Sequence, residues 1–401
     1  MSIDTAERYT IISSDCHAGA DHATYRDYLD TRWHDDFDAW RGEYTNPFKD
    51  LQEADKGKRR NWDDELRVSE QNADGIVAEI TFPNTVPPFF PTGTLIAYPP
   101  KERADYERRR AGVQAHNRWL ADWCGRFPAR RRGVAQIFLN DVDETVADIR
   151  TAHRLGLRSI LLPSVPPDQG IPALFEDCYR PVWAVCQELG MVVTAHAGNG
   201  APDYAEHDSA GMIFIQEVPF FSNRTLWHLI LSGVFEQFPG LKLVMTEQGV
   251  GWVPDTLRRL DGLYMQGKAT GRIGELGFPS DDRLAMKPSE YFDRNVWIGA
   301  SFPGPREAAA IRKIGAHKAM WGSDYPHHEG TPPYSREALR LSFHDWDEAD
   351  LRKILSENAA MVYGFDLDVL DPLGAEFGPT VDEVKVPLDA KPERATSPAF
   401  F

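Results

Sequence analysis

The chain contains few cysteines, and their spacing does not suit a structural role. Cys16, Cys124, Cys178 and Cys186 include no C-x-x-C pair, which argues against a disulfide framework and against a zinc site built from thiolates. The first ten residues show no basic segment followed by an apolar stretch, so we expect no signal peptide. Reduced thiols without a leader predict a cytoplasmic protein.

Long apolar runs and positive charge are also lacking. No run approaches the roughly 20 residues that span a bilayer. The 61 acidic residues outnumber the 44 basic ones, and the net charge of −17 repels phosphate backbones. No P-loop, G-x-G-x-x-G or G-x-S-x-G motif follows a predicted strand, so nucleotide and serine-nucleophile chemistry have no support. We expect a small-molecule substrate, with no nucleic acid and no membrane as partner.

What the sequence does contain is an alternation of apolar runs with helical segments. Eight runs are predicted strands, at 9–15, 72–84, 133–140, 157–164, 191–198, 241–249, 295–301 and 318–327. Helices are expected between them, among others at 141–156, 172–190 and 224–240. Continuous apolar runs are typical of parallel strands buried on both faces. Eight such units predict an α/β fold, a distorted (β/α)8 TIM barrel rather than an open sheet.

Two segments fit this barrel poorly. We assign residues 1–366 to a single barrel domain, with an insertion or cap at 19–72 after the first strand. Trp33, Trp40 and Trp62 in the insertion either roof a substrate pocket or form a packing flap or dimer contact. The Pro-rich C-terminal extension, 367–401, is expected to wrap the surface or a partner subunit. A homodimer or higher homo-oligomer is the expected assembly.

Acidic and imidazole side chains stand at the ends of four predicted strands. Asp15 and His17 are two residues apart, so in a strand they point the same way. His196, Glu247 and Asp324 end the fifth, sixth and eighth strands. Active sites of such barrels lie at this end of the strands. Each residue alone has an ordinary structural explanation, but their convergence predicts one divalent metal, zinc first, with manganese or iron as alternatives.

Other polar residues near the strand ends are weaker candidates. Arg224 and His228 share one helix face at i and i+4, and Arg224 either binds a substrate carboxylate or forms a structural salt bridge. His327 and His328 follow Asp324 closely, and one of them could support the metal ligands while the other is exposed. We therefore treat Arg224, His228 and His327 as candidate substrate-binding residues.

Several segments resemble the amidohydrolase superfamily, in particular the branch of aminocarboxymuconate-semialdehyde, γ-resorcylate and 5-carboxyvanillate decarboxylases. They are "SSDCHAG", "VVTAHAG", "HLILSGVFEQFPGLKLVMTEQGVGWVP", "MWGSDYPHHEGTPP" and "ILSENAAMVYGF". The resemblance implies a distorted barrel with one divalent metal, held here by Asp15, His17, His196 and Asp324. It also implies that Asp324 acts in proton transfer. One position departs from the family, since Glu247 stands where a strand-six histidine is common.

Three functions are compatible with these residues. We expect first a mononuclear metal-dependent hydrolase of a small cyclic or aromatic compound, in which activated water attacks, Asp324 is the base and Glu247 the acid. The alternative is a nonoxidative, metal-dependent decarboxylase of a phenolic or enolic acid. A catalytically inactive barrel that serves as a binding or scaffold subunit is a third possibility, against which the retention of all four ligands argues.

Overall fold

Eight parallel strands form the centre of the computed structural model, which describes residues 7–45, 59–92, 97–163, 169–198, 201–202, 204, 207–280 and 282–401. Their order in the sheet follows the chain. The strands are β1 (Ile12–Ala18), β2 (Ala78–Pro83), β3 (Arg131–Gln136), β4 (Ser159–Leu161), β5 (Val192–His196), β6 (Lys242–Thr246), β9 (Val296–Ser301) and β10 (Ala319–Gly322). The prediction of eight strands in an α/β barrel is confirmed.

The first and last strands approach each other and bring the sheet close to a closed barrel. The backbone amide of Asp324 donates to the carbonyl of Asp15 at 2.8 Å, and the amide of His17 donates to the carbonyl of Tyr325 at 2.7 Å. These two bonds place a parallel bridge between Cys16 and Tyr325. The carboxyl ends of β1 and β10, where candidate residues stand, therefore lie next to each other.

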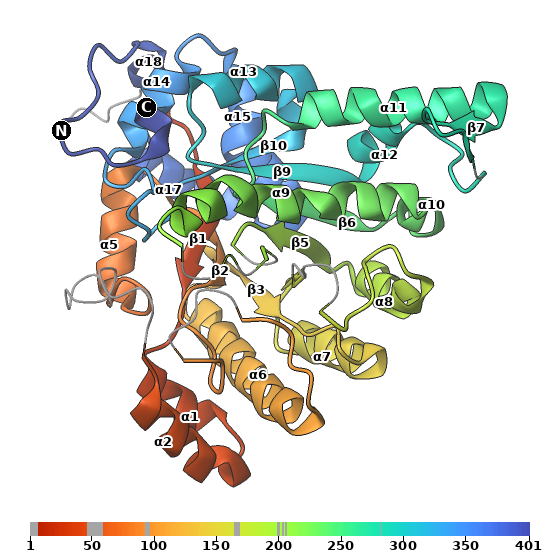
Figure 1. Cartoon of the computed structure of the whole chain (residues 1–401). Helices are drawn as coiled ribbons and strands as arrows, with labels where there is room; N and C mark the ends of the chain where they lie inside the picture. Colours follow the sequence, from red (N-terminus) through yellow and green to blue (C-terminus); the bar gives the residue numbers. More distant parts are fainter. Residues whose placement is uncertain are drawn as a thin grey trace.

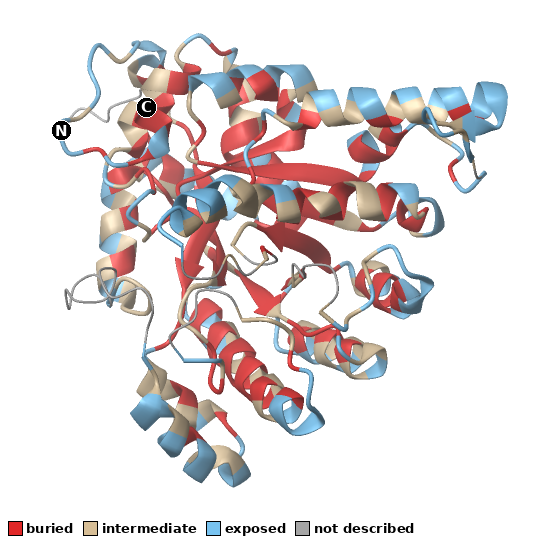
Figure 2. Cartoon of the chain, in the orientation of Figure 1, coloured by how far each residue is buried: buried red, intermediate tan, exposed pale blue. Residues whose placement is uncertain are grey.

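Helices surround the strands (Figure 1), and the strands themselves are almost entirely buried (Figure 2). The outer helices are α6 (Arg103–Gly125), α7 (Val142–Arg154), α8 (Arg180–Leu189), α9 (Ala210–Leu231), α10 (Val234–Gln237), α11 (Val253–Thr270), α12 (Pro288–Asn295), α13 (Pro305–Ile314), α14 (Ser335–Phe343), α15 (Glu348–Arg352) and α16 (Asn358–Tyr363). A two-strand hairpin, β7 (Arg272–Ile273) with β8 (Phe278–Pro279), follows α11. None of the described helices is long and apolar enough to cross a membrane.

The helix predicted at 224–240 is in fact two helices, since α9 ends at Leu231 and α10 begins at Val234 after Gly233. Two helix starts also differ from the prediction. The helix expected to start at 224 is α9, which already begins at Ala210 and includes Pro219. Its first half is mostly apolar, with Gln216 and Glu217 as the exceptions, and contains a proline, so neither helical periodicity nor a start signal was visible there. The helix expected from 172 begins at Arg180, with Pro181 in its first turn, a position that proline favours.

The insertion and the C-terminal extension have structures of their own. The insertion contributes α1 (Tyr25–Tyr28), α2 (His34–Glu43) and α5 (Asp64–Asp74), while its residues 46–58 lie outside the described part. The extension forms α17 (Leu367–Phe377) and α18 (Val381–Lys385), and Thr380 bridges to Arg8 near the N-terminus. The last residues then return to the mouth of the barrel, where Thr396 donates to the carbonyl of His328.

Candidate metal centre

Strand β1 carries two of the candidate ligands on one side. Asp15 is completely buried and His17 nearly so, and both lie within the strand, as their spacing predicts. Nε2 of His17 lies 3.3 Å from Oδ1 of Asp15. Nε2 of His196, at the end of β5, lies 3.3 Å from the same oxygen. The three side chains therefore converge on one point from two strands.

Asp324, after β10, completes this cluster. Its Oδ1 lies 3.1 Å from Nε2 of His17 and 2.9 Å from Nδ1 of His327. Among the described residues, neither oxygen of Asp324 nor Nε2 of His17 has a hydrogen-bond partner, although all three atoms are buried. Two ligand atoms that each lie about 2.1 Å from the same metal ion are about 3 Å apart when the ligand–metal–ligand angle is close to 90°. The spacing and the missing partners both fit a divalent cation.

Electrostatics keep the two aspartates ionised. Burial alone would raise the pKa of Asp15, but the charge of His196 and the nearby imidazole of His17 hold it well below its usual range. Burial likewise opposes ionisation of Asp324, and the charge of His327 together with the nearby imidazole of His17 lowers its pKa. The pKa values of His17 and His196 are raised by the same contacts, against the effect of burial. The cluster thus presents charged oxygens to a cation.

Neighbouring groups hold the ligands in place. The hydroxyl of Ser301, at the end of β9, donates to Oδ2 of Asp15. Nδ1 of His196 lies 2.7 Å from the carbonyl of Ala197, which orients Nε2 toward Asp15, 3.3 Å away, on the side where a metal would bind. Gly322 provides the space for Asp15, since a Cβ there would lie 2.7 Å from that of Asp15. Sequence reasoning missed Ser301, although its position at a strand end could have suggested it.

Glu247, after β6, approaches the cluster from another side. Its Oε2 lies 3.3 Å from Nδ1 of His196, the nitrogen that faces away from Asp15. Burial raises the pKa of Glu247 to about 8, with His196 opposing and the charges of Asp324 and Asp15 adding to the shift. Glu247 and Asp324 both have positive φ angles, 56° and 61°. Such backbone strain is costly and is commonly retained at functional sites.

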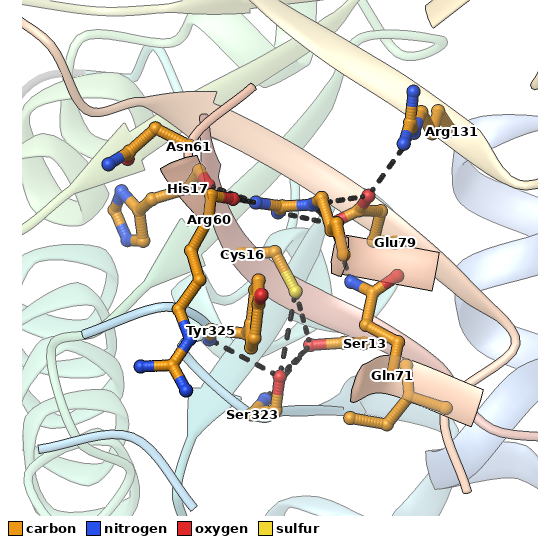
Figure 3. Close-up of polar contacts among 12 residues, drawn as sticks. Ser13, Cys16, His17, Arg60, Asn61, Gln71, Glu79, Arg131, Ser323 and Tyr325 are labelled. Carbon is orange, nitrogen blue, oxygen red and sulfur yellow. Dashed lines mark hydrogen bonds and ion pairs between the residues drawn. The ribbon is translucent and has the colours of Figure 1, made fainter. Parts of the chain in front are cut away.

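A buried polar network supports the strand that carries His17 (Figure 3). The guanidinium of Arg67, fully buried, donates to the carbonyl of His17 at 2.8 Å and to that of Arg60 at 2.9 Å. It also pairs with Glu79 of β2, which accepts a further bond from Gln71 at 2.9 Å. Arg67 therefore ties β1, β2 and the segment before α5 together beneath the cluster.

A cavity of about 1540 Å³ opens above the cluster, with His17, His196, Glu247 and His327 among its lining residues. The other candidates from the sequence take different places. Neither Arg224 nor His228 lines the cavity, and the ring of His228 packs against a side chain of the loop before α8. Three tryptophans of the insertion are likewise absent from the lining and pack against the core: Trp33, Trp40 and Trp62.

Comparison with known proteins identifies the family. The model of the amidohydrolase family matches residues 22–365. The chain belongs to this family. An amidohydrolase-family relative, the γ-resorcylate decarboxylase of Rhodococcus jostii (strain RHA1), is 27% identical over 282 residues, 67% of this chain and 80% of that protein. The γ-resorcylate decarboxylase of Polaromonas sp. (strain JS666) is 25% identical over 232 residues, 56% of this chain and 68% of that protein.

A solved structure of the amidohydrolase family has the same fold. The 5-carboxyvanillate decarboxylase of Novosphingobium aromaticivorans, with bound manganese and 3-methoxy-4-hydroxy-5-nitrobenzoic acid, superposes with a TM-score of 0.66 at 20% identity. The match covers 88% of this chain and 97% of that one. The resemblance inferred from the sequence motifs is therefore confirmed.

The comparisons correct the reaction expected from the sequence. We expected a hydrolase, but both relatives are decarboxylases, so the hydrolase expectation is wrong. The reason is chemical: the same histidine and carboxylate ligands serve both reactions, and the residues that choose between them lie in loops. That the chain is an enzyme of the amidohydrolase family stands.

Proposed function

We propose that this protein is a metal-dependent, nonoxidative decarboxylase of an aromatic acid that carries a hydroxyl next to its carboxylate. One observation carries the proposal: a chain similar to γ-resorcylate decarboxylases brings Asp15, His17 and His196 together, with Asp324 beside His17, next to a large cavity that His17 and His196 line. The contacts of Asp324 favour it further, because both of its buried oxygens lack hydrogen-bond partners within the described part of the chain.

The ligand set fits one divalent ion, held by Asp15, His17, His196 and Asp324. We favour manganese over zinc, because the two carboxylates suit it and a similar solved structure contains it. When bound, the ion would supply positive charge that orients the hydroxyl and carboxylate oxygens of the substrate and offsets their negative charge.

In this proposal Asp324 delivers the proton. Because Asp324 is ionised at rest, the proton first passes to its Oδ1 from Nδ1 of His327, 2.9 Å away. From Asp324 the proton adds to the ring carbon that bears the carboxylate; the bond between the two carbons then breaks, carbon dioxide leaves and the ring regains aromaticity. His327 takes up a new proton from solvent. Glu247 is a substrate-facing hydrogen-bond donor, since it lines the cavity and burial raises the pKa of its carboxyl to about 8. Because these side chains are largely shielded from water, the electrostatic contacts between them and the substrate are stronger than they would be in solvent.

Assembly and cellular location remain predictions. We retain a homodimer or higher homo-oligomer and a cytoplasmic location as expectations from the sequence. Sedimentation of the purified protein would measure the first, and fractionation of cells would measure the second.

A direct assay tests the proposed reaction. The protein is stripped of metal, reloaded with manganese and incubated with a panel of hydroxybenzoates while released carbon dioxide is measured. We expect carbon dioxide and the matching phenol in equal amounts, only after metal is restored. Turnover of lactones or amides with no release from any hydroxybenzoate would refute the decarboxylase proposal.

A further inference from the structure

The cavity is larger than the substrates named for the relatives require. At about 1540 Å³, it exceeds the roughly 300–1,000 Å³ typical of pockets for drug-sized ligands. A single-ring hydroxybenzoate held at the metal cluster would fill only its floor. The chemistry of the remaining walls therefore bears on what else the substrate carries.

One wall is apolar and comes from α9. Phe214, Ile215 and Val218 line the cavity, and Ile215 leaves 74% of its surface exposed. When an apolar ligand covers an exposed isoleucine in a cavity, apolar surface is removed from water, and this favours binding. This wall favours a second apolar group on the substrate, beyond the ring at the cluster.

The C-terminal extension contributes a positively charged residue, Arg394, to the lining of the cavity. Residues 394–398 and Phe400 line the cavity. The segment is anchored there, because Ala399 and Phe400 are buried, in a cluster that packs against Phe302 after β9. Thr396 also binds the loop after β10 through the carbonyl of His328. The extension, which lies beyond the family match, is thus part of the cavity.

Two arginines line this cavity, and only one of them is neutralised by a neighbour. Arg60 pairs with Glu70, its Nε lying 2.7 Å from Oε2. Among the described residues, Arg394 forms no ion pair and no hydrogen bond. In a chain of net charge −17, an unpaired guanidinium at the cavity rim is a favourable contact for an anionic group.

We propose that the substrate is an extended aromatic acid, larger than one ring, whose apolar middle lies against α9 and whose far end is an anion bound by Arg394. The inference rests on the proposed function, since it assumes that the hydroxybenzoate end lies at the metal cluster. Residues of α9 and of the C-terminal extension would then determine the substrate specificity.

Binding of matched ligands tests this without turnover. Three kinds of ligand are titrated calorimetrically into manganese-loaded protein. They are salicylate, salicylate with a phenyl group on ring carbon 4 or 5, and salicylate with a 4-carboxyphenyl group on ring carbon 4 or 5. For at least one isomer, we expect the phenyl group to tighten binding by about fivefold or more, and the distal carboxylate by a further threefold or more, in line with a charged hydrogen bond.

Matched variants locate the two contacts. Arg394→Gln should lose the gain from the distal carboxylate, whereas Arg306→Gln, an exposed arginine on α13 outside the lining, should keep it. Ile215→Ser should lose the gain from the phenyl group, whereas Met212→Ser, 81% exposed on the same helix but outside the lining, should keep it.

Failure of this inference differs from failure of the proposed function. If salicylate binds only in the presence of metal but neither extension tightens binding, the substrate is a single-ring acid and the inference is wrong. Equal losses in Arg394→Gln and Arg306→Gln would also overturn it. If salicylate binding does not depend on metal, the proposed function fails instead.

Discussion

Oδ1 of Asp324 lies 3.1 Å from Nε2 of His17, and neither atom has a hydrogen-bond partner within the described residues. The two side chains come from the last and first strands of the barrel, which meet through backbone bonds between the segments that carry them. Closure of the barrel therefore creates the centre. Because Oδ1 of Asp324 and Nε2 of His17 are both buried without a hydrogen-bond partner, the space beside them is the expected position of a cation.

Removal of a histidine ligand should remove the metal. His196→Ala deletes one of the nitrogens that face Asp15, and we expect loss of most bound manganese and of activity while the circular dichroism spectrum stays unchanged. Metal content measured by mass spectrometry provides the test. His228→Ala, a histidine outside the cavity lining, is the control and should retain its metal; equal metal in both variants would contradict the ligand assignment.

Asp324→Asn separates metal binding from proton transfer. The amide keeps one ligand oxygen but cannot carry the transferred proton, so we expect partial metal retention and a rate reduced by at least about 100-fold. Steady-state kinetics at saturating manganese measure the effect. Turnover near the wild-type rate would exclude Asp324 as the proton donor.

Glu247→Gln distinguishes a ligand from a substrate contact. Because Glu247 faces the outward nitrogen of His196, the variant should keep one tightly bound metal per chain while turnover falls about tenfold or more. Metal analysis and kinetics on the same preparation are needed. Loss of the tightly bound ion would show instead that Glu247 is a primary ligand.

The stability of the fold should depend on pH through Asp74. This carboxyl at the end of α5 accepts a bond from the amide of Ser335 at 3.0 Å, and burial raises its pKa to about 6. A raised pKa in the folded state means that protonation stabilises the fold fully below pH 4 and that this contribution disappears as the pH rises through 6.

Asp74→Asn should therefore have a larger free energy of unfolding than wild type at pH 7.5, by at most about 3 kcal/mol, and the difference should vanish below pH 4. A difference independent of pH in urea unfolding would contradict this.

Loss of Arg67 should destabilise the protein strongly. Arg67→Ala leaves the buried carboxylate of Glu79 and the carbonyl of His17 without their main partner, which predicts a loss of about 3–5 kcal/mol in the free energy of unfolding. The double variant Arg67→Met with Glu79→Leu removes both charges and should recover part of that loss. If the single and double variants unfold at the same urea concentration, the buried charge is not the cause.

The sequence predicted the strands and the cluster for a physical reason. Parallel strands buried on both faces are continuous apolar runs, and the ends of all of them meet at one mouth, so residues that end strands converge. Asp15, His17, His196 and Asp324 could therefore be brought together from their positions alone.

The supporting and lining residues were not visible in the sequence. Ser301 and Arg67 act through approaches between distant segments; only the strand-end position of Ser301 gave a local signal, and no local pattern marks Arg67. The start of α9 lay in an apolar stretch with an internal proline, and the C-terminal extension was expected to wrap the surface or a partner subunit, not to line the cavity. The reaction itself was misjudged because it depends on such loop contacts rather than on the metal ligands.

Isotope incorporation into the product tests the central claim most directly. A hydroxybenzoate that the manganese-loaded protein consumes is incubated in water containing both deuterium and oxygen-18, and the product is analysed by mass spectrometry. Decarboxylation with Asp324 as proton donor predicts one deuterium on the ring carbon that bore the carboxylate, no oxygen-18 in the phenol, and no product without metal. Oxygen-18 in the organic product, or deuterated phenol formed at the same rate by metal-free protein, would contradict a metal-dependent decarboxylase.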